Sequence, residues 1–183
     1  VRLDEMTPPD EADLVAEVTC EQAVLLNEDA VAENGEKLPR LAVIDCGIKY
    51  NILRELCKRF EVVWCPATTT FDDILEWQPD ALFASNGPGD PAHIGAATTA
   101  RDSLAAAVRA GLPVMGICLG HQLMGLAAGL RTYKLRYGHR GANQPVVDLQ
   151  SGRVNITSQN HGFAVEDPEK GMLAPHPSGV CSA

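Results

Sequence analysis

The feature that most constrains the fold is Cys118, which lies between a short apolar run and a stretch of helical periodicity. The run over residues 113–117 is typical of a buried parallel strand. The leucines and alanines that follow recur at helical spacing, and Gly129 predicts the end of that helix. Gly116 and Gly120 allow a sharp turn on each side of the cysteine. The sequence therefore predicts a strand–turn–helix elbow with Cys118 at the carboxyl edge of a parallel sheet.

A cysteine at such an elbow suits nucleophilic chemistry. The first N–H groups of the helix would point back at the sulfur, where they stabilise a thiolate and could hold an oxyanion. The alternative is a small buried cysteine that fills space at the end of a strand. Because glycines, strand and helix all surround Cys118, we favour the nucleophile.

Regular alternation of strands and helices begins at residue 40. It predicts an α/β domain over residues 40–183, with an open, mainly parallel sheet and helices on both faces. The predicted strands and helices up to the elbow cover residues 41–45, 51–59, 61–65, 80–85 and 97–108, with a short helix capped by Thr70. After Gly129 we expect short strands joined by loops, at residues 132–135, 145–149 and 153–158.

Residues 1–39 differ from the rest because they are rich in Asp and Glu and contain only short apolar runs. We expect this segment to be the acidic tail or linker of a mostly missing preceding domain. Asp13 to Val18 within it could form a turn of helix or a short strand.

Composition excludes several classes of function. The net charge is −9 and no cluster of Lys or Arg occurs, which argues against binding to nucleic acid or to an anionic membrane surface. None of the six cysteines forms a Cys-x-x-Cys pair or stands at zinc-ligand spacing with histidines, so we expect no metal site. Reduced cysteines and the lack of a signal peptide or a membrane-length apolar run favour a cytoplasmic protein.

Three further stretches offer groups for a polar substrate. The loop Ser85–Pro91 contains two glycines and two prolines, and its backbone N–H groups could form an oxyanion hole, although a plain turn would also fit. The stretch 138–145 is a polar loop with two glycines, and 159–165 is a predicted strand that breaks into Asn-His-Gly.

On these motifs the chain resembles the class I glutamine amidotransferases, and among them the glutamine-hydrolysing small subunits of carbamoyl-phosphate synthase. The resemblance runs from about residue 12 to Val165. It is strongest in the segments 45–54, 85–91, 116–122, 138–146 and 159–165. It implies a flavodoxin-like fold and a role in arginine and pyrimidine biosynthesis.

The resemblance also implies roles for individual residues. Cys118 would attack the side-chain amide of glutamine, and Gly87 and Leu119 would hold the oxyanion. The groups that would bind the amino and carboxylate groups of L-glutamine are Gly89, Gln122, Asn160, Gly162 and Phe163. The ammonia would pass to a large synthetase subunit. That partner would bind ATP and magnesium, and this chain would hold no cofactor.

One part of the family pattern is missing from the 183 residues. In the family a histidine in a Gly-His-Pro-Glu stretch activates the cysteine, and the glutamate orients that histidine. Here Pro175-His176-Pro177-Ser178 has neither the glycine nor the glutamate, and His121 and His161 belong to other motifs. We therefore expect the domain over residues 40–183 to be incomplete at its C-terminus, and its glutaminase activity alone to be weak or absent. The alternative is a non-catalytic glutamine-binding or regulatory module that lacks the catalytic His and Glu.

Overall fold

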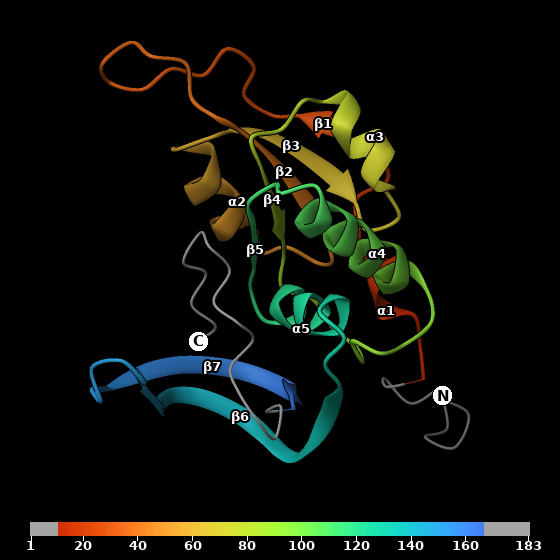
Figure 1. The fold of residues 1–183 in the computed structure, drawn as a ribbon, viewed down its shortest axis with the longest axis vertical. Coiled ribbons are helices and arrows are strands. Elements are labelled where there is room, and N and C mark those ends of the chain that lie inside the picture. The colour runs from red at the N-terminus through yellow and green to blue at the C-terminus, as the bar shows by residue number, and fades with distance from the viewer. Residues whose placement is uncertain (1–10, 167–183) are drawn as a thin grey trace. The chain divides into compact units, whose positions relative to one another are not determined.

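The computed structural model describes residues 11–166, which fall into two compact units divided after Gly129. The first unit is an α/β layer structure and the second is a long β-hairpin (Figure 1). None of the helices in the described range has the length and apolar character that crossing a membrane requires.

The first unit contains a five-stranded sheet in the order β1-β3-β2-β4-β5. Four strands are parallel to one another, and the short first strand runs antiparallel to β3 at the edge of the sheet. The strands are β1 (Val24–Leu25), β2 (Arg40–Asp45), β3 (Glu61–Pro66), β4 (Ala81–Ala84) and β5 (Val114–Gly116). The predicted open, mainly parallel sheet is confirmed, and its predicted strands lie within one or two residues of the observed ones.

Helices cover both faces of this sheet, as predicted. One face carries α2 (Tyr50–Cys57), whose Leu53 packs with Leu41 and Val43 of β2. Ala42 and Ile44, the alternate residues of the same strand, belong to the core on the other face. That face is covered by α1 (Leu14–Val18), α3 (Phe71–Glu76), α4 (Ala96–Arg109) and α5 (Leu119–Ala127).

The expected helix boundaries are also present. The Thr70 hydroxyl accepts a hydrogen bond from the Asp73 backbone N–H at 3.3 Å and caps α3. Gly111 and Gly129 follow the ends of α4 and α5 with φ of +75° and +84°, the left-handed conformation that glycine adopts without steric cost.

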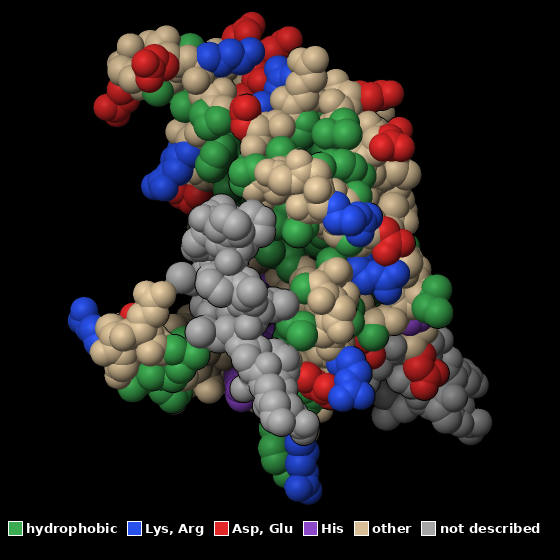
Figure 2. Space-filling model, viewed as in Figure 1, with side chains coloured by type: hydrophobic (Ala, Val, Ile, Leu, Met, Phe, Trp, Pro, Cys, Tyr) green, Lys and Arg blue, Asp and Glu red, His purple; other side chains and the backbone are tan. Residues whose placement is uncertain are grey.

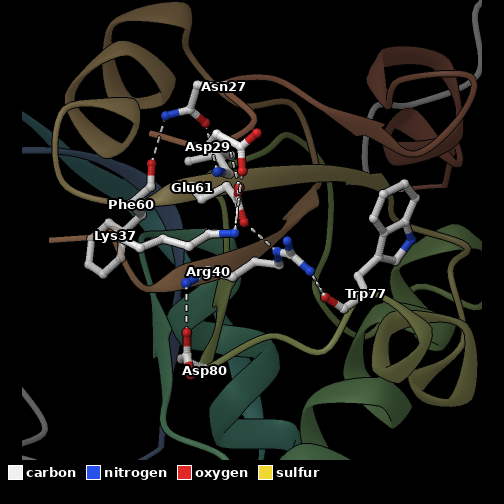
Figure 3. A network of polar contacts seen from close by, with 9 residues as sticks. Asn27, Asp29, Lys37, Arg40, Phe60, Glu61, Trp77 and Asp80 are labelled. Carbon is white, nitrogen blue, oxygen red and sulfur yellow. Dashed lines mark hydrogen bonds and ion pairs between the residues drawn. The ribbon is translucent and has the colours of Figure 1, made fainter. Parts of the chain in front are cut away.

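The described part of the acidic segment, residues 11–39, contacts the sheet. Val15 of α1 is buried in the core, and β1 extends the sheet beside β3. Figure 3 shows how residues 27–37 are fixed at the start of β3. The Asn27 side chain donates to the carbonyls of Cys57 and Phe60, and Glu61 accepts from the Asp29 backbone N–H and from Arg40. The assignment of residues 1–39 to a preceding domain stays a prediction.

The second unit differs from the sequence expectation. The short strands and polar loops expected after Gly129 are two long antiparallel strands, β6 (Thr132–Val147) and β7 (Val154–Val165). The expected loop 138–145 lies within β6, and the Asn-His-Gly stretch continues β7 without a break. The expectation was wrong because Gly138 and Gly141, read as loop residues, sit at two register shifts, where a ladder bends without ending.

Candidate functional site

Cys118 occupies the sharp turn between β5 and α5. Its φ of 54° and ψ of −110° lie outside the regions that residues with a β-carbon normally adopt. Such backbone strain costs about 1–3 kcal/mol and is typically stored where function requires it. Its carbonyl accepts the hydrogen bond of the Gln122 N–H at 3.1 Å, so the helix begins immediately after the cysteine. The predicted strand–turn–helix elbow is confirmed.

Two glycines are required by close contacts around this turn. A β-carbon on Gly116 would lie 2.4 Å from the carbonyl carbon of Gly120, and one on Gly120 would lie 2.1 Å from the Ala84 carbonyl oxygen. The Gly120 N–H also donates to the Ser85 carbonyl oxygen at 3.0 Å. The first turn of α5 is therefore held directly against the end of β4.

The loop after β4 lies beside the elbow. A β-carbon on Gly87 would be 2.0 Å from the Cys46 carbonyl oxygen and 2.8 Å from the Leu119 side chain. Gly87 is thus wedged between the end of β2 and the start of α5. The two residues predicted to hold an oxyanion, Gly87 and Leu119, are neighbours in space, although they are far apart in the sequence.

This loop is fixed by polar side chains to which the sequence assigned no individual role. The Ser85 hydroxyl accepts from the Cys46 N–H at 2.9 Å and donates to the Asn86 carbonyl at 2.8 Å. The Asn86 amide donates to the Gly47 carbonyl at 3.0 Å. The sequence could have indicated Ser85 and Asn86, because they directly follow an apolar strand. Functional polar residues gather at this position in open α/β sheets.

Asp45 fixes the turn at the end of β2 in a similar way. Its buried carboxylate accepts hydrogen bonds from the backbone N–H groups of Gly47 and Ile48, both at 2.8 Å, and of Cys20 at 2.9 Å. These bonds satisfy a charge that would otherwise be costly to bury. They fix the turn at Gly47, against which Gly87 packs, so Asp45 holds the backbone beside the site in place.

The other residues of the first unit singled out from the sequence lie on α5 and in the loop after β4. Gln122 lies on α5 and is largely buried, with 6% of its surface exposed. Gly89 adopts a φ of +86°, and a β-carbon added there would lie 3.8 Å from Cβ of Leu14 in α1. His121 lies on α5 beside Gln122.

Among the described thiols, Cys46 and Cys65 are buried, whereas Cys20, Cys57 and Cys118 are partly exposed. Burial raises the pKa of Cys46 and of Cys65 to about 12. Burial, reinforced by the nearby Asp45 carboxylate, raises the pKa of Cys20 to about 12 as well. Burial also raises the pKa of Cys57. These thiols are held in the unreactive, protonated form at neutral pH.

Three predicted substrate-binding residues lie in the second unit, on β7. Asn160 pairs with Arg140 of β6, Phe163 pairs with Lys134, and Gly162 lies between them in the sequence. The roles of these residues, like that of Cys118, stay predictions. His176 lies outside the described residues.

Comparison with known proteins places these features in a family. Residues 42–178 match the glutamine amidotransferase class-I family. The carbamoyl phosphate synthase small chain of Methanosarcina mazei is 47% identical over 156 residues, which is 84% of this chain and 41% of that protein. The protein of the same name from Methanocaldococcus jannaschii is 45% identical over 152 residues, 82% of this chain and 42% of its own length. The chain therefore spans about two fifths of the length of these relatives.

A solved structure shows the same fold at lower identity. A Thermoplasma acidophilum protein described as part of a GMP synthase superposes with a TM-score of 0.55 at 21% identity, covering 73% of this chain and 70% of that one. The elbow at Cys118, the family match over residues 42–178 and this fold agree, and the chain belongs to the class-I glutamine amidotransferase family.

Proposed function

We propose that this chain is the glutamine-hydrolysing portion of a carbamoyl-phosphate synthase small chain. The observation that carries the proposal is the strained backbone of Cys118 at a glycine-bounded elbow beside Gly87. Relatives that are 45–52% identical carry the name carbamoyl phosphate synthase small chain, which supports this branch of the family.

The proposed reaction has two halves. The Cys118 thiolate attacks the side-chain amide carbon of glutamine, and the negative charge that develops on the amide oxygen is held by the N–H groups of Gly87 and Leu119. The C–N bond breaks, and ammonia leaves with a proton supplied by a general acid, so a glutamyl thioester remains on the sulfur. Water then cleaves the C–S bond, which releases glutamate and restores the thiol.

The substrate and partner follow from the same proposal. Gly89, Gln122, Asn160, Gly162 and Phe163 would bind the amino and carboxylate groups of glutamine. Ammonia would pass to a large synthetase subunit, on which ATP and magnesium would bind. The described cysteines are free thiols, which supports a reducing, cytoplasmic compartment.

The experiment uses radiolabelled glutamine and two proteins. One is this chain, and the other is a chimaera in which this chain continues into the corresponding residues of the Methanosarcina mazei protein. Acid quenching traps the thioester as protein-bound label, and glutamate release measures turnover. We expect Cys118→Ser to lower turnover of the chimaera by at least about a thousandfold and to abolish the trapped label. Cys57→Ser, which changes a thiol away from the elbow, should retain both.

This chain alone should turn over more slowly than the chimaera, by the ~10²–10⁴-fold that a general acid and base contribute. A chimaera that binds glutamine but releases no glutamate, with or without Cys118, would instead indicate a non-catalytic binding module. Fast turnover by this chain that is lost in His176→Ala would make His176 the base.

A further inference from the structure

Two histidines face each other across the β6–β7 hairpin. His139 and His161 are register partners, and their ring atoms Nδ1 and Nε2 lie 3.3 Å apart. The rings are nearly perpendicular, at 84°, with centroids 4.9 Å apart. His139 is exposed and His161 half-buried.

Neighbouring hydrogen bonds fix which atoms face one another. The Thr157 hydroxyl donates to the Gln144 carbonyl at 2.9 Å, so its oxygen accepts from the Gln159 amide nitrogen at 3.0 Å. This leaves the Gln159 Oε1 atom 2.9 Å from Nε2 of His161. The other ring nitrogen of His161 lies 2.8 Å from the Phe163 carbonyl, which can only accept, so that nitrogen carries the hydrogen.

The consequence is that an amide oxygen faces the lone pair of His161, while Nδ1 of His139 donates a hydrogen to that lone pair in one tautomer and presents a second lone pair in the other. In neutral His161 the Nε2 atom holds a lone pair, and it faces an amide oxygen as well as the Nδ1 atom of His139. Two lone pairs at hydrogen-bond distance repel unless a proton or a metal ion lies between them. A histidine whose second nitrogen donates to a backbone carbonyl is also the usual arrangement of a metal ligand.

The spacing fits a metal of tetrahedral geometry. With Zn–N bonds of about 2.0–2.1 Å, two nitrogens of a tetrahedral site are separated by about 3.3–3.4 Å. The Nδ1 atom of His139 and the Nε2 atom of His161 are 3.3 Å apart and match this value, whereas the Gln159 Oε1 atom, 2.9 Å from Nε2, would move outward by about 0.4 Å to join the same ion. Imidazole ligands suit zinc, copper and nickel, whereas magnesium and calcium prefer oxygen.

The surroundings allow such an ion. Arg140, the nearest cation in the sequence, lies on the opposite side of β6, where its guanidinium faces Gly138 and Gly162. Within the described residues no group of three His, Cys, Asp or Glu is placed to hold a metal, so the third protein ligand would be the Gln159 oxygen. Register shifts lie on both sides of the paired residues 139–141, so a bound ion would cross-link the strands between two irregular stretches of the ladder.

We propose that His139, His161 and the Gln159 side-chain oxygen form a site for a borderline divalent metal of the Zn²⁺ class, completed by water. This site does not depend on the proposed glutaminase function.

The test is a Zn²⁺ titration of the whole 183-residue chain in a Cys118→Ser background, which removes the thiol at the elbow. Calorimetry gives the stoichiometry and affinity, and NMR of the histidine ring signals locates the ion. We expect one Zn²⁺ per chain, joint shifts of the His139 and His161 signals, no shifts for His93, His121 and His176, and no response to Mg²⁺.

Three variants complete the design. His139→Ala should weaken Zn²⁺ binding by about tenfold or more, and Gln159→Glu should tighten it by about tenfold because a carboxylate replaces the amide oxygen. His93→Ala should bind as the parent does. If His139→Ala disrupts the hairpin, the ring signals of the parent and the gain in Gln159→Glu still decide the question. Ring signals that move with pH but not with Zn²⁺, or equal affinity in parent and His139→Ala, would overturn the proposal.

Discussion

At the scale of single residues, the backbone of Cys118 is strained, with a φ of 54° and a ψ of −110°. Among the described residues, three without the freedom of glycine adopt a positive φ: Asp29, Gln78 and Cys118, at 56°, 52° and 54°. Asp is a residue type that tolerates this conformation, because its short polar side chain can bond locally. Cys118 has no such advantage. The close contacts of Gly116 and Gly120 hold the chain on both sides of this strained turn.

The residue-scale prediction concerns alkylation. Under limiting iodoacetamide at neutral pH, Cys118 should be labelled before Cys20, Cys46, Cys57 and Cys65, because burial raises the pKa of each of those thiols. Peptide mapping by mass spectrometry measures the order. Denatured protein is the control and should lose the selectivity. Earlier labelling of Cys46 or Cys65 in the native chain would contradict the assignment of the elbow.

At the scale of elements, the sequence predicted what depends on local periodicity and turn chemistry. The parallel strands, the Thr70 cap and the elbow follow from residues within about ten positions of one another. The site's supporting contacts could not be predicted in this way. The bond from Cys46 to Ser85 and that from Cys20 to Asp45 join residues that are 39 and 25 positions apart. The hairpin was missed because Gly138 and Gly141 break the alternation that identifies a strand.

The element-scale prediction concerns Glu61, whose side chain is inaccessible to solvent at the start of β3. Its carboxylate lies 2.6 Å from Arg40 Nε and 3.6 Å from Lys37 Nζ (Figure 3). The Lys37 side chain is itself largely exposed, so only a thin layer of side chains separates the carboxylate from solvent. Chiefly the hydrogen bond from Arg40 lowers the pKa of Glu61. Glu61→Gln should therefore destabilise the fold by about 1–3 kcal/mol at pH 7.

The pH dependence has a definite sign. A carboxyl whose pKa is lower in the folded state stabilises the protein above its unfolded pKa of about 4.3, and this stabilisation is lost as the pH falls further. The urea midpoint difference between the parent and Glu61→Gln should thus shrink below about pH 4. Glu55→Gln removes an exposed pair with Lys58 and should change little at any pH. A difference that stays constant down to about pH 3 would show that the Glu61 charge is not the cause.

At the scale of the whole molecule, burial is unevenly divided between the two units. All the described residues with buried side chains belong to the first unit, where two clusters pack on the two faces of the sheet. The hairpin instead exposes apolar side chains: Tyr133, Tyr137, Val147, Leu149, Val154 and Ile156. In the space-filling view apolar side chains lie on the surface of the hairpin as well (Figure 2). A two-stranded sheet without a core is marginally stable in water.

This division predicts two levels of protection from hydrogen exchange. Amides of β2, β3 and β4 should exchange only through global unfolding, because both faces of these strands are buried. Amides of β6 and β7 should exchange through local opening of the hairpin and be at least about a hundredfold less protected. Exchange at neutral pH followed by proteolysis and mass spectrometry resolves the two groups. The exposed helix α2 provides an internal reference, since it is hydrogen-bonded but packs on the sheet through one face only. Protection of β7 equal to that of β2 would mean that the hairpin is covered in solution, and its exposed apolar side chains would then be buried in a contact.

Added Zn²⁺ should slow exchange near His139 and His161 and leave β2 unchanged, since the proposed ion joins only the two strands of the hairpin.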